Sequence, residues 1–138
     1  MNNLFILDAC ALIALLAGEK GAEKVRDIIQ DAIDGKVTVK INQINLLEVY
    51  YHTINIYDQN KANEMLNVIK KFPIEVMIGL EESTFNEAGR IKSKYKIPLG
   101  DSIVVAECII KKGTLVTSDH SDFERMETAE NIEINWFR

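Results

Sequence analysis

The sequence predicts an α/β fold: a three-layer α/β/α sandwich whose central sheet is mostly parallel and has roughly five strands. The spacing of apolar residues switches repeatedly between the period of a strand and that of a helix, and strands alternating with helices form parallel sheets. The first apolar run, LFIL at Leu4–Leu7, is continuous, as expected for a strand buried on both faces. With 138 residues, 47% of them apolar, and no repeat or linker, the chain is expected to form a single domain over 1–138.

In the first half of the chain, two stop signals separate the expected elements. Gly35 closes one helical stretch and Pro73 another, because glycine readily takes the conformation that ends a helix and proline cannot continue one. The expected elements are, in order, strand Leu4–Leu7, helices Cys10–Leu16 and Ala22–Ile33, strand Val37–Ile41, and helices Gln43–Ile56 and Lys61–Lys71.

In the second half, Pro98 and Gly113 end two further helical patterns. The expected elements are strand Ile74–Ile78, helix Glu81–Lys96, the almost wholly apolar helix Asp101–Lys112, and two short strands, Leu115–Thr117 and Ile132–Ile134. The segment Asp119–Phe123, DHSDF, is interpreted as a loop after the fourth strand.

Composition narrows the class of function. A formal net charge of -5 argues against a protein that holds nucleic acid by bulk electrostatics, although it leaves room for a local basic rim. No apolar run is long enough to span a bilayer, so no membrane role is expected. Cys10 and Cys108 lie in apolar runs without CxxC spacing, which predicts two core thiols in a reducing cytoplasm rather than a zinc site or a disulfide.

Acidic residues follow two of the predicted strands. Asp8 comes directly after LFIL, and Asp119 follows LVTS at the end of the fourth strand. In parallel sheets ligands bind outside the carboxyl ends of the strands, so both acids are expected at the binding edge. Asp101 lies in the first turn of its helix and shares a face with Val104 and Cys108. Singly, each acid is equally well explained as a turn residue or a helix cap.

Glu48 is the fourth acid, and it stands where the helix pattern is apolar. Ile44, Leu47 and Tyr51 have the spacing of a core-facing stripe, and Glu48 falls on it. Because an unpaired buried charge is costly, either a buried lysine pairs with Glu48, or the helix has a different phase, or the carboxylate faces a metal-binding crevice.

Four segments, LFILD, NLLEVYY, PLGDSIVVAE and LVTSDHSDF, occur in an order that resembles the PIN-domain ribonucleases, and most of all the VapC-type toxins of toxin–antitoxin pairs. The resemblance implies a PIN-like fold, an RNA substrate, a homodimer, and a cognate antitoxin whose tail occludes the acidic crevice. It also implies catalytic and metal-binding roles for four acids, with a fifth as helper: Asp8, Glu48, Asp101, Asp119 and Asp122. Cys10 departs from the pattern, since many relatives carry a small hydroxyl or amide residue there.

The chemistry of converging carboxylates leads to the same reaction. Such groups repel one another, and a hard divalent cation, Mg²⁺ or Mn²⁺, relieves the repulsion through the oxygen ligands that it prefers. Without histidine or cysteine at the four positions, zinc is disfavoured. A bound metal can activate water for attack on a phosphodiester. Thr117 and Ser118 are expected to orient Asp119 or a metal-bound water. We therefore predict a Mg²⁺- or Mn²⁺-dependent ribonuclease, acting in the cytoplasm as a toxin.

Candidate RNA contacts are Arg90, Lys94 and His120, and each has a structural alternative. The two cations fall late in a helix that begins with acids, which complements the helix dipole, and the histidine is equally at home in a solvated loop. Two rival functions stay open. One is a catalytically silent PIN-like module that binds RNA or protein; the other is a different Mg²⁺-dependent α/β phosphohydrolase, whose second aspartate would stand where Cys10 is.

Overall fold

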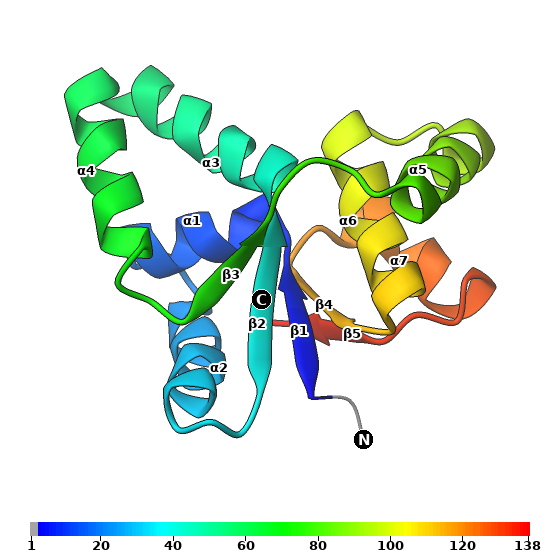
Figure 1. Ribbon diagram of the computed structural model, residues 1–138, viewed down its shortest axis with the longest axis horizontal. Coiled ribbons are helices and arrows are strands. Elements are labelled where there is room, and N and C mark those ends of the chain that lie inside the picture. Colours follow the sequence, from blue (N-terminus) through cyan, green and yellow to red (C-terminus); the bar gives the residue numbers. More distant parts are fainter. Residues whose placement is uncertain (1–2) are drawn as a thin grey trace.

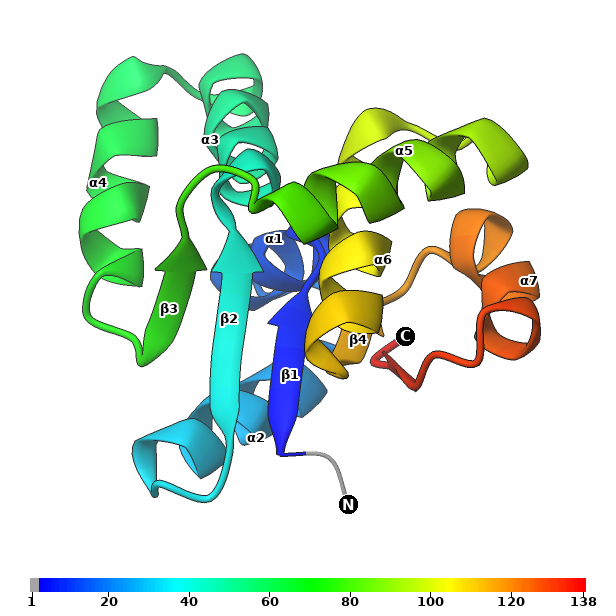
Figure 2. The same cartoon turned by 45° about the vertical axis from the view of Figure 1, so that its right-hand side comes forward.

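Five parallel strands form one sheet in the order β3-β2-β1-β4-β5 in the computed structural model, which describes residues 3–138 (Figures 1 and 2). The elements are β1 (Leu4–Leu7), α1 (Ala9–Ala17), α2 (Ala22–Ile33), β2 (Thr38–Asn42), α3 (Gln43–Ile56), α4 (Gln59–Ile69), β3 (Ile74–Met77), α5 (Glu82–Tyr95), α6 (Leu99–Lys111), β4 (Thr114–Thr117), α7 (His120–Ala129) and β5 (Ile134–Trp136). The predicted fold class is confirmed, and the sheet is wholly parallel.

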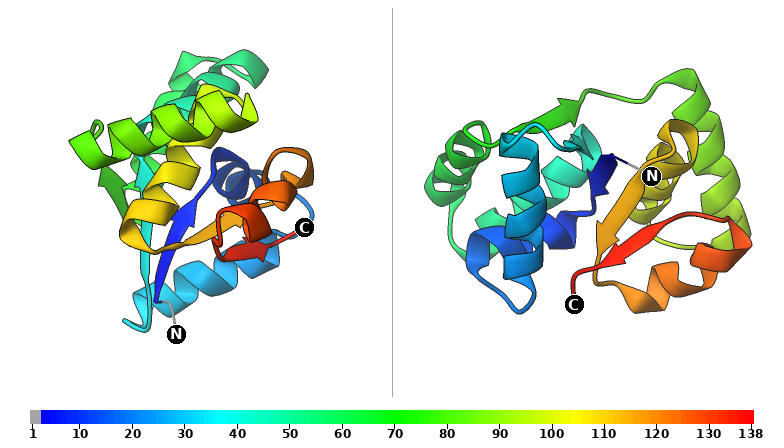
Figure 3. Two further views of the ribbon diagram at one scale, coloured as in Figure 1. Left: turned by 90° about the vertical axis from the view of Figure 1, so that its right-hand side faces the viewer. Right: turned by 90° about the horizontal axis from the view of Figure 1, so that it is seen from below.

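Helices cover both faces of the sheet, and each face has its own core. The view from below in Figure 3 shows the sheet between α1 to α4 on one side and α5 to α7 on the other. On the first side Leu12, Val25, Val49 and Met65 belong to one apolar cluster, and on the second Ile91, Val104, Phe123 and Met126 belong to another. Because strands buried on both faces need apolar side chains on both, the continuous LFIL run is explained. Among residues 3–138, no helix combines the length and the apolar character needed to cross a bilayer.

The order in which the chain adds strands to the sheet reverses between β1 and β4. From β1 the chain steps outward to β2 and β3, then returns past β1 to β4 and steps outward again to β5. The point at which strand order reverses leaves a crevice at the carboxyl ends of the two central strands. Asp8 follows one of these strands and Asp119 lies two residues beyond the other.

Two predictions about local structure were wrong. The segment predicted as a loop after Asp119 begins helix α7, in which only Phe123 and Met126 are buried. A short helix with only two buried side chains offers few apolar positions from which to predict it, and its stability comes from packing those two side chains against the second core. The last strand runs two residues later than predicted, at Ile134–Trp136, because pairing with β4 decides its register.

The phase of α3 also differs from the predicted one. Leu47 and Tyr51 of the expected stripe are 52% and 50% exposed, whereas Asn45 and Val49 are fully buried. Two of the three apolar residues of the predicted stripe therefore face outward, whereas Ile44 is partly buried against a small apolar cluster. Glu48 is partly exposed and is not part of a sealed core. The buried face of α3 includes a polar residue, Asn45, which no hydrophobic pattern would select.

Candidate active site

Asp8 is fixed at the end of β1 by three donors. Its Oδ1 accepts from the backbone N–H of Ala9 at 2.9 Å, which caps α1, and its Oδ2 accepts from the Thr117 hydroxyl at 2.9 Å. The Cys10 thiol lies 3.4 Å from the same Oδ2, so it occupies the place where a hydroxyl or amide was expected. The pKa of Asp8 is raised to about 6, mainly by burial and to a smaller extent by the charge of Glu48, although the hydrogen bonds act in the opposite direction.

Thr117 connects the two central strand ends. While its hydroxyl donates to Asp8, the same oxygen accepts from the backbone N–H of Asp119 at 3.1 Å. Thr117 is fully buried, so its side chain is held by packing. One hydroxyl thus connects the Asp8 carboxylate to the backbone of Asp119. A supporting role of Thr117 in catalysis stays a prediction.

Asp101, Asp119 and Asp122 bring carboxylate oxygens within 4.8 Å of one another. Asp119 caps α7: its Oδ1 accepts from the N–H of Asp122 at 3.2 Å and from the Ser121 hydroxyl at 2.8 Å. Helix α7, which the sequence did not predict, therefore brings Asp122 into the cluster. Desolvation raises the pKa of Asp101 to about 9, helped by a hydrogen bond with Asp122 and by the charges of Asp8, Asp122 and Asp119. The same hydrogen bond lowers the pKa of Asp122.

Glu48 reaches the cluster from α3. Its Oε1 accepts from the Asn45 side-chain amide at 3.1 Å, so its partner is a neutral group rather than the buried lysine that the sequence allowed. Desolvation raises the pKa of Glu48. Its carboxylate lies against Gly100, the residue before Asp101, where an added Cβ would stand 2.4 Å from Oε1. The four predicted acids are thus gathered around one edge of the sheet.

This donor set fits a hard divalent cation. All of the convergent groups are carboxylates, and the pKa values of Asp8 and Asp101 are raised partly by the charges of neighbouring acids. A cation would stabilise the ionised forms that this repulsion disfavours. Carboxylate oxygens, without nitrogen or thiolate ligands, suit Mg²⁺ or Mn²⁺.

The predicted RNA contacts are each held by other groups of the protein. Arg90 and Lys94 pair with Glu130 at 2.7 and 3.3 Å and so tie α5 to the end of α7. His120 stacks on the Trp136 ring with 4.0 Å between ring centroids, and its Nε2 lies 2.9 Å from the Arg138 carbonyl oxygen.

Arg138 is a cation near the site that the sequence prediction missed. Its guanidinium donates to the Ser118 hydroxyl at 3.1 Å and pairs with Glu19 at 3.4 Å. Ser118 in turn points to the Cys10 thiol, 3.7 Å away. The pairing of β5 with β4 brings Arg138 back beside Ser118. The sequence does contain a signal for this residue: a cation closely follows the last strand, in the order Trp-Phe-Arg.

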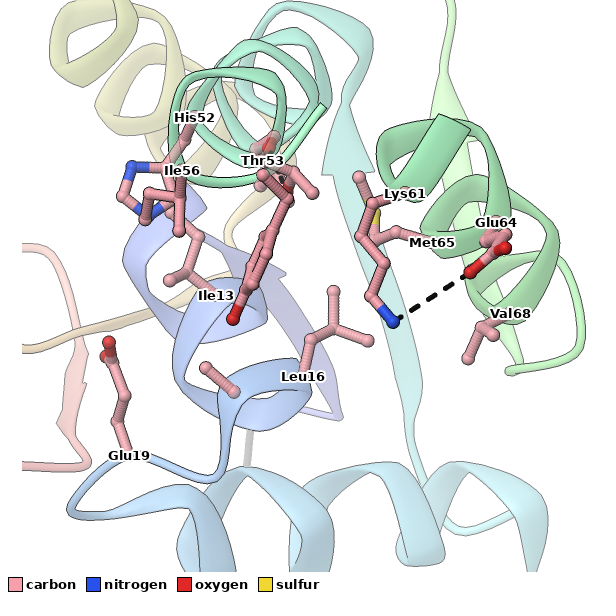
Figure 4. A pocket seen from close by; sticks show the side chains of 13 residues that line it. Ile13, Leu16, Glu19, His52, Thr53, Ile56, Lys61, Glu64, Met65 and Val68 are labelled. Carbon is pink, nitrogen blue, oxygen red and sulfur yellow. Dashed lines mark hydrogen bonds and ion pairs between the residues drawn. The ribbon is translucent and has the colours of Figure 1, made fainter. Parts of the chain in front are cut away.

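An apolar cavity of about 310 Å³ lies away from the acids, between α1, α3 and α4 (Figure 4). Ile13, Leu16, Ile56, Met65 and Val68 are among the side chains that line it, and the ion pair between Lys61 and Glu64, 3.8 Å long, stands at its side. It contains no cluster of catalytic groups. The acidic edge of the sheet is therefore the candidate active site, and the cavity is a separate feature.

Comparisons with known proteins agree with the fold described above. The profile of the PIN domain family matches residues 5–128. A chain of VapBC2 from Rickettsia felis, bound to a DNA fragment from its promoter, is similar with a TM-score of 0.76 and 15% identity, over 96% of this chain and 97% of that one. DNA-bound VapBC from Salmonella typhimurium gives 0.74 and 14% over 100% of both chains. FitAcB from Neisseria gonorrhoeae gives 0.64 and 18% over 94% and 95%. No curated protein sequence matches. At these identities the solved structures show the shared fold.

Proposed function

The chain belongs to the PIN domain family, and from that premise we propose that it is a divalent-metal-dependent ribonuclease hydrolysing RNA phosphodiester bonds. The observation that carries the proposal is the convergence of Asp101, Asp119 and Asp122, with Asp8 and Glu48 beside them, at the carboxyl edge of the sheet. A structural role alone would not favour so many mutually repelling carboxylates at one place.

Each residue of the site has a role in this proposal. Asp8, Asp101 and Asp119 would hold Mg²⁺ or Mn²⁺, with Glu48 and Asp122 as the neighbouring carboxylates. Such a cation would supply the activation of a water molecule and the stabilisation of charge on the leaving oxygen. Thr117 orients Asp8 through its hydroxyl and sets the backbone of Asp119. The raised pKa of Asp101 favours a protonated carboxyl without metal, and a bound cation would favour the ionised form instead.

We propose further that the protein is the toxin of a toxin–antitoxin pair and acts in the cytoplasm. The similar structures from Rickettsia felis and Salmonella typhimurium are toxin–antitoxin complexes of the VapBC type. The apolar cavity between α1, α3 and α4 supports a protein partner, because an apolar groove of that kind suits an amphipathic helix. Exposed apolar side chains on and around α5 and α6, such as Ile78, Phe85 and Leu99, support a homodimer.

The experiment that tests the nuclease proposal is cleavage of a labelled structured RNA. Purified wild type is assayed with Mg²⁺, with Mn²⁺ and with EDTA, and Asp8→Asn is prepared in parallel as a control for contaminating nuclease. We expect metal-dependent cleavage that falls at least about 100-fold in Asp8→Asn, because the substitution removes a metal ligand. Equal cleavage by wild type and variant would contradict the proposal. RNA binding that is insensitive to EDTA, without cleavage, would favour a silent module instead.

The dimer is tested separately by light scattering on the eluate of a sizing column. Phe85 is 65% exposed on α5, so Phe85→Glu should leave the fold intact and shift the mass from dimer to monomer. Glu124→Gln, on the exposed part of α7, is the control and should keep the wild-type mass. A wild type that elutes as a monomer at all concentrations would contradict the dimer.

A further inference from the structure

The Asn45 side chain bridges two helices at the acidic edge. It is fully buried, and its Nδ2 donates both to Glu48 Oε1 at 3.1 Å and to the Gly100 carbonyl at 3.0 Å. Glu48 lies one helical turn beyond Asn45 on α3, and Gly100 directly precedes Asp101 on α6. One amide group therefore connects an acid of α3 to the turn of α6 that carries another acid.

The surroundings of Gly100 show independently that the Glu48 carboxylate lies against α6. A Cβ added at Gly100 would stand 2.4 Å from Oε1, 2.5 Å from Oε2 and 2.6 Å from Cδ of Glu48. The carboxylate thus occupies the space that any other residue at position 100 would fill. The Glu48 carboxylate therefore lies between the Asn45 amide and the backbone of α6.

Fold stability does not explain why an asparagine stands at position 45. Within residues 3–138, its Oδ1 is the one fully buried side-chain oxygen or nitrogen without a hydrogen-bond partner. Leaving a buried acceptor unpaired is destabilising, and a leucine, which has the same branched shape but no polar atoms, would avoid that penalty. The carbonyl of Gly100, in the first turn of α6, takes part in the helical hydrogen-bond pattern whether or not Asn45 is present. What the amide alone supplies is a donor to Glu48.

We propose that Asn45 is a positioning residue, which acts through Glu48 to set the geometry of the proposed metal site. This inference rests on the proposed function. Without the amide, the Glu48 side chain keeps its charge but loses the contact that aims it at the first turn of α6. The carboxylate then samples several rotamers, and binding a cation must order it. Groups that orient metal ligands in this way typically contribute 10- to 100-fold to metal affinity.

The test is Mn²⁺ binding to the full chain, measured by titration calorimetry, beside thermal unfolding of the metal-free protein. We expect Asn45→Leu to bind Mn²⁺ about 10-fold more weakly than wild type while its Tm without metal stays equal or rises. Asn45→Ala, which adds no bulk, is measured in the same way in case leucine does not fit. Asn55→Leu makes the same change at an exposed position of the same helix and should leave both quantities unchanged.

A double-mutant cycle distinguishes positioning from a general structural role. If Asn45 acts only through Glu48, then in a Glu48→Ala background Asn45→Leu should not weaken Mn²⁺ binding further. An undiminished effect in that background would overturn the inference, and so would wild-type affinity in both Asn45 variants. A different result would overturn the proposed function instead: no Mn²⁺ binding by wild type, or Mn²⁺ binding that Asp8→Asn leaves unchanged.

Discussion

Cys10 illustrates how a single residue tunes the site. Its thiol lies 3.4 Å from both the Asp8 carboxylate and the Thr117 hydroxyl, in a place where the resemblance led us to expect a hydroxyl or amide. Sulfur is a weak donor, so Thr117 is left as the strong side-chain donor to Asp8. The expected consequence is a site in which Asp8 depends on one hydroxyl from the neighbouring strand.

The two thiols should react slowly in the folded protein. Burial raises the pKa of Cys10 to about 11, and the nearby Asp8 charge adds to the shift; burial also raises the pKa of Cys108. Since the thiolate is the reactive form, we expect neither cysteine to react with a disulfide reagent such as DTNB at pH 8 on the time scale on which urea-unfolded protein reacts fully. The absorbance of the released chromophore measures this. A fast phase in the folded protein that Cys10→Ala removes would contradict the expectation for Cys10.

At the scale of elements, the approach of α3 to α6 is set at a glycine. Gly100 and Gly89 are both helical, but only at Gly100 would a Cβ meet the Glu48 carboxylate; at Gly89 it would meet nothing within 4 Å. Alanine is favoured over glycine in any helix interior, so the same substitution at both positions should have the same effect through helix propensity. Any difference between the two variants would then come from the contact with Glu48.

We predict opposite outcomes for the two glycine-to-alanine variants. Gly89→Ala should stabilise the protein by about 0.5–1 kcal/mol and leave Mn²⁺ affinity unchanged. Gly100→Ala should displace Glu48 and weaken Mn²⁺ binding several-fold. Urea unfolding and calorimetry give the two quantities. If Gly100→Ala bound Mn²⁺ as tightly as Gly89→Ala, the contact with Glu48 would have no bearing on the site.

Glu130 ties α5 to the end of α7 and forms ion pairs with both cations that were predicted to contact RNA. Arg90, Lys94 and Tyr95 all donate to its carboxylate, which lowers the pKa of Glu130 to about 2. Glu130→Gln should cost about 1–2 kcal/mol of stability, since the cations of these pairs are partly exposed. It should also lower the KM for RNA by freeing Arg90 and Lys94.

Glu127→Gln is the matched control, because it removes the same charge from the same helix. Steady-state cleavage and urea unfolding measure both effects. An unchanged KM together with the loss of stability would assign the two cations to the fold alone.

For the whole molecule, the acids of the site and Glu130 act on stability in opposite pH ranges. The pKa values of Asp8 and Asp101 are raised to about 6 and about 9, so without metal their contribution is fully present below about pH 4 and is lost as pH rises through those values. The pKa of Glu130 is lowered to about 2, so its contribution is present above about pH 4.5 and lost as pH falls. The metal-free protein should be most stable near about pH 4–5.

Urea unfolding in EDTA should therefore show lower stability at pH 8 than at pH 5. Mn²⁺ should recover much of the loss at pH 8, because the cation stabilises the ionised carboxylates. Asp101→Asn should flatten the decline in EDTA, since its side chain does not titrate. A wild type equally stable at both pH values in EDTA would show that the folded acids have ordinary pKa values.

Much of the arrangement follows from the sequence by itself. Alternating strand and helix patterns determine the α/β class, and glycine and proline determine where most helices end, because these signals are local. Asp8 and Asp119 could be predicted for the same reason: Asp8 directly follows one recognisable strand, Asp119 lies two residues beyond another, and parallel strands end at one edge.

Tertiary structure decided the rest, because it depends on partners distant in the chain. Packing of α3 on the first core buries Val49, and its contact with α6 buries Asn45, whereas Leu47 and Tyr51 of the predicted stripe are exposed. Packing of two side chains, Phe123 and Met126, stabilises α7 and so brings Asp122 to the acids. The contact of Glu48 with Gly100 joins residues of α3 and α6 that no local pattern relates. Local patterns determine which elements form, whereas packing between elements determines which of their faces meet.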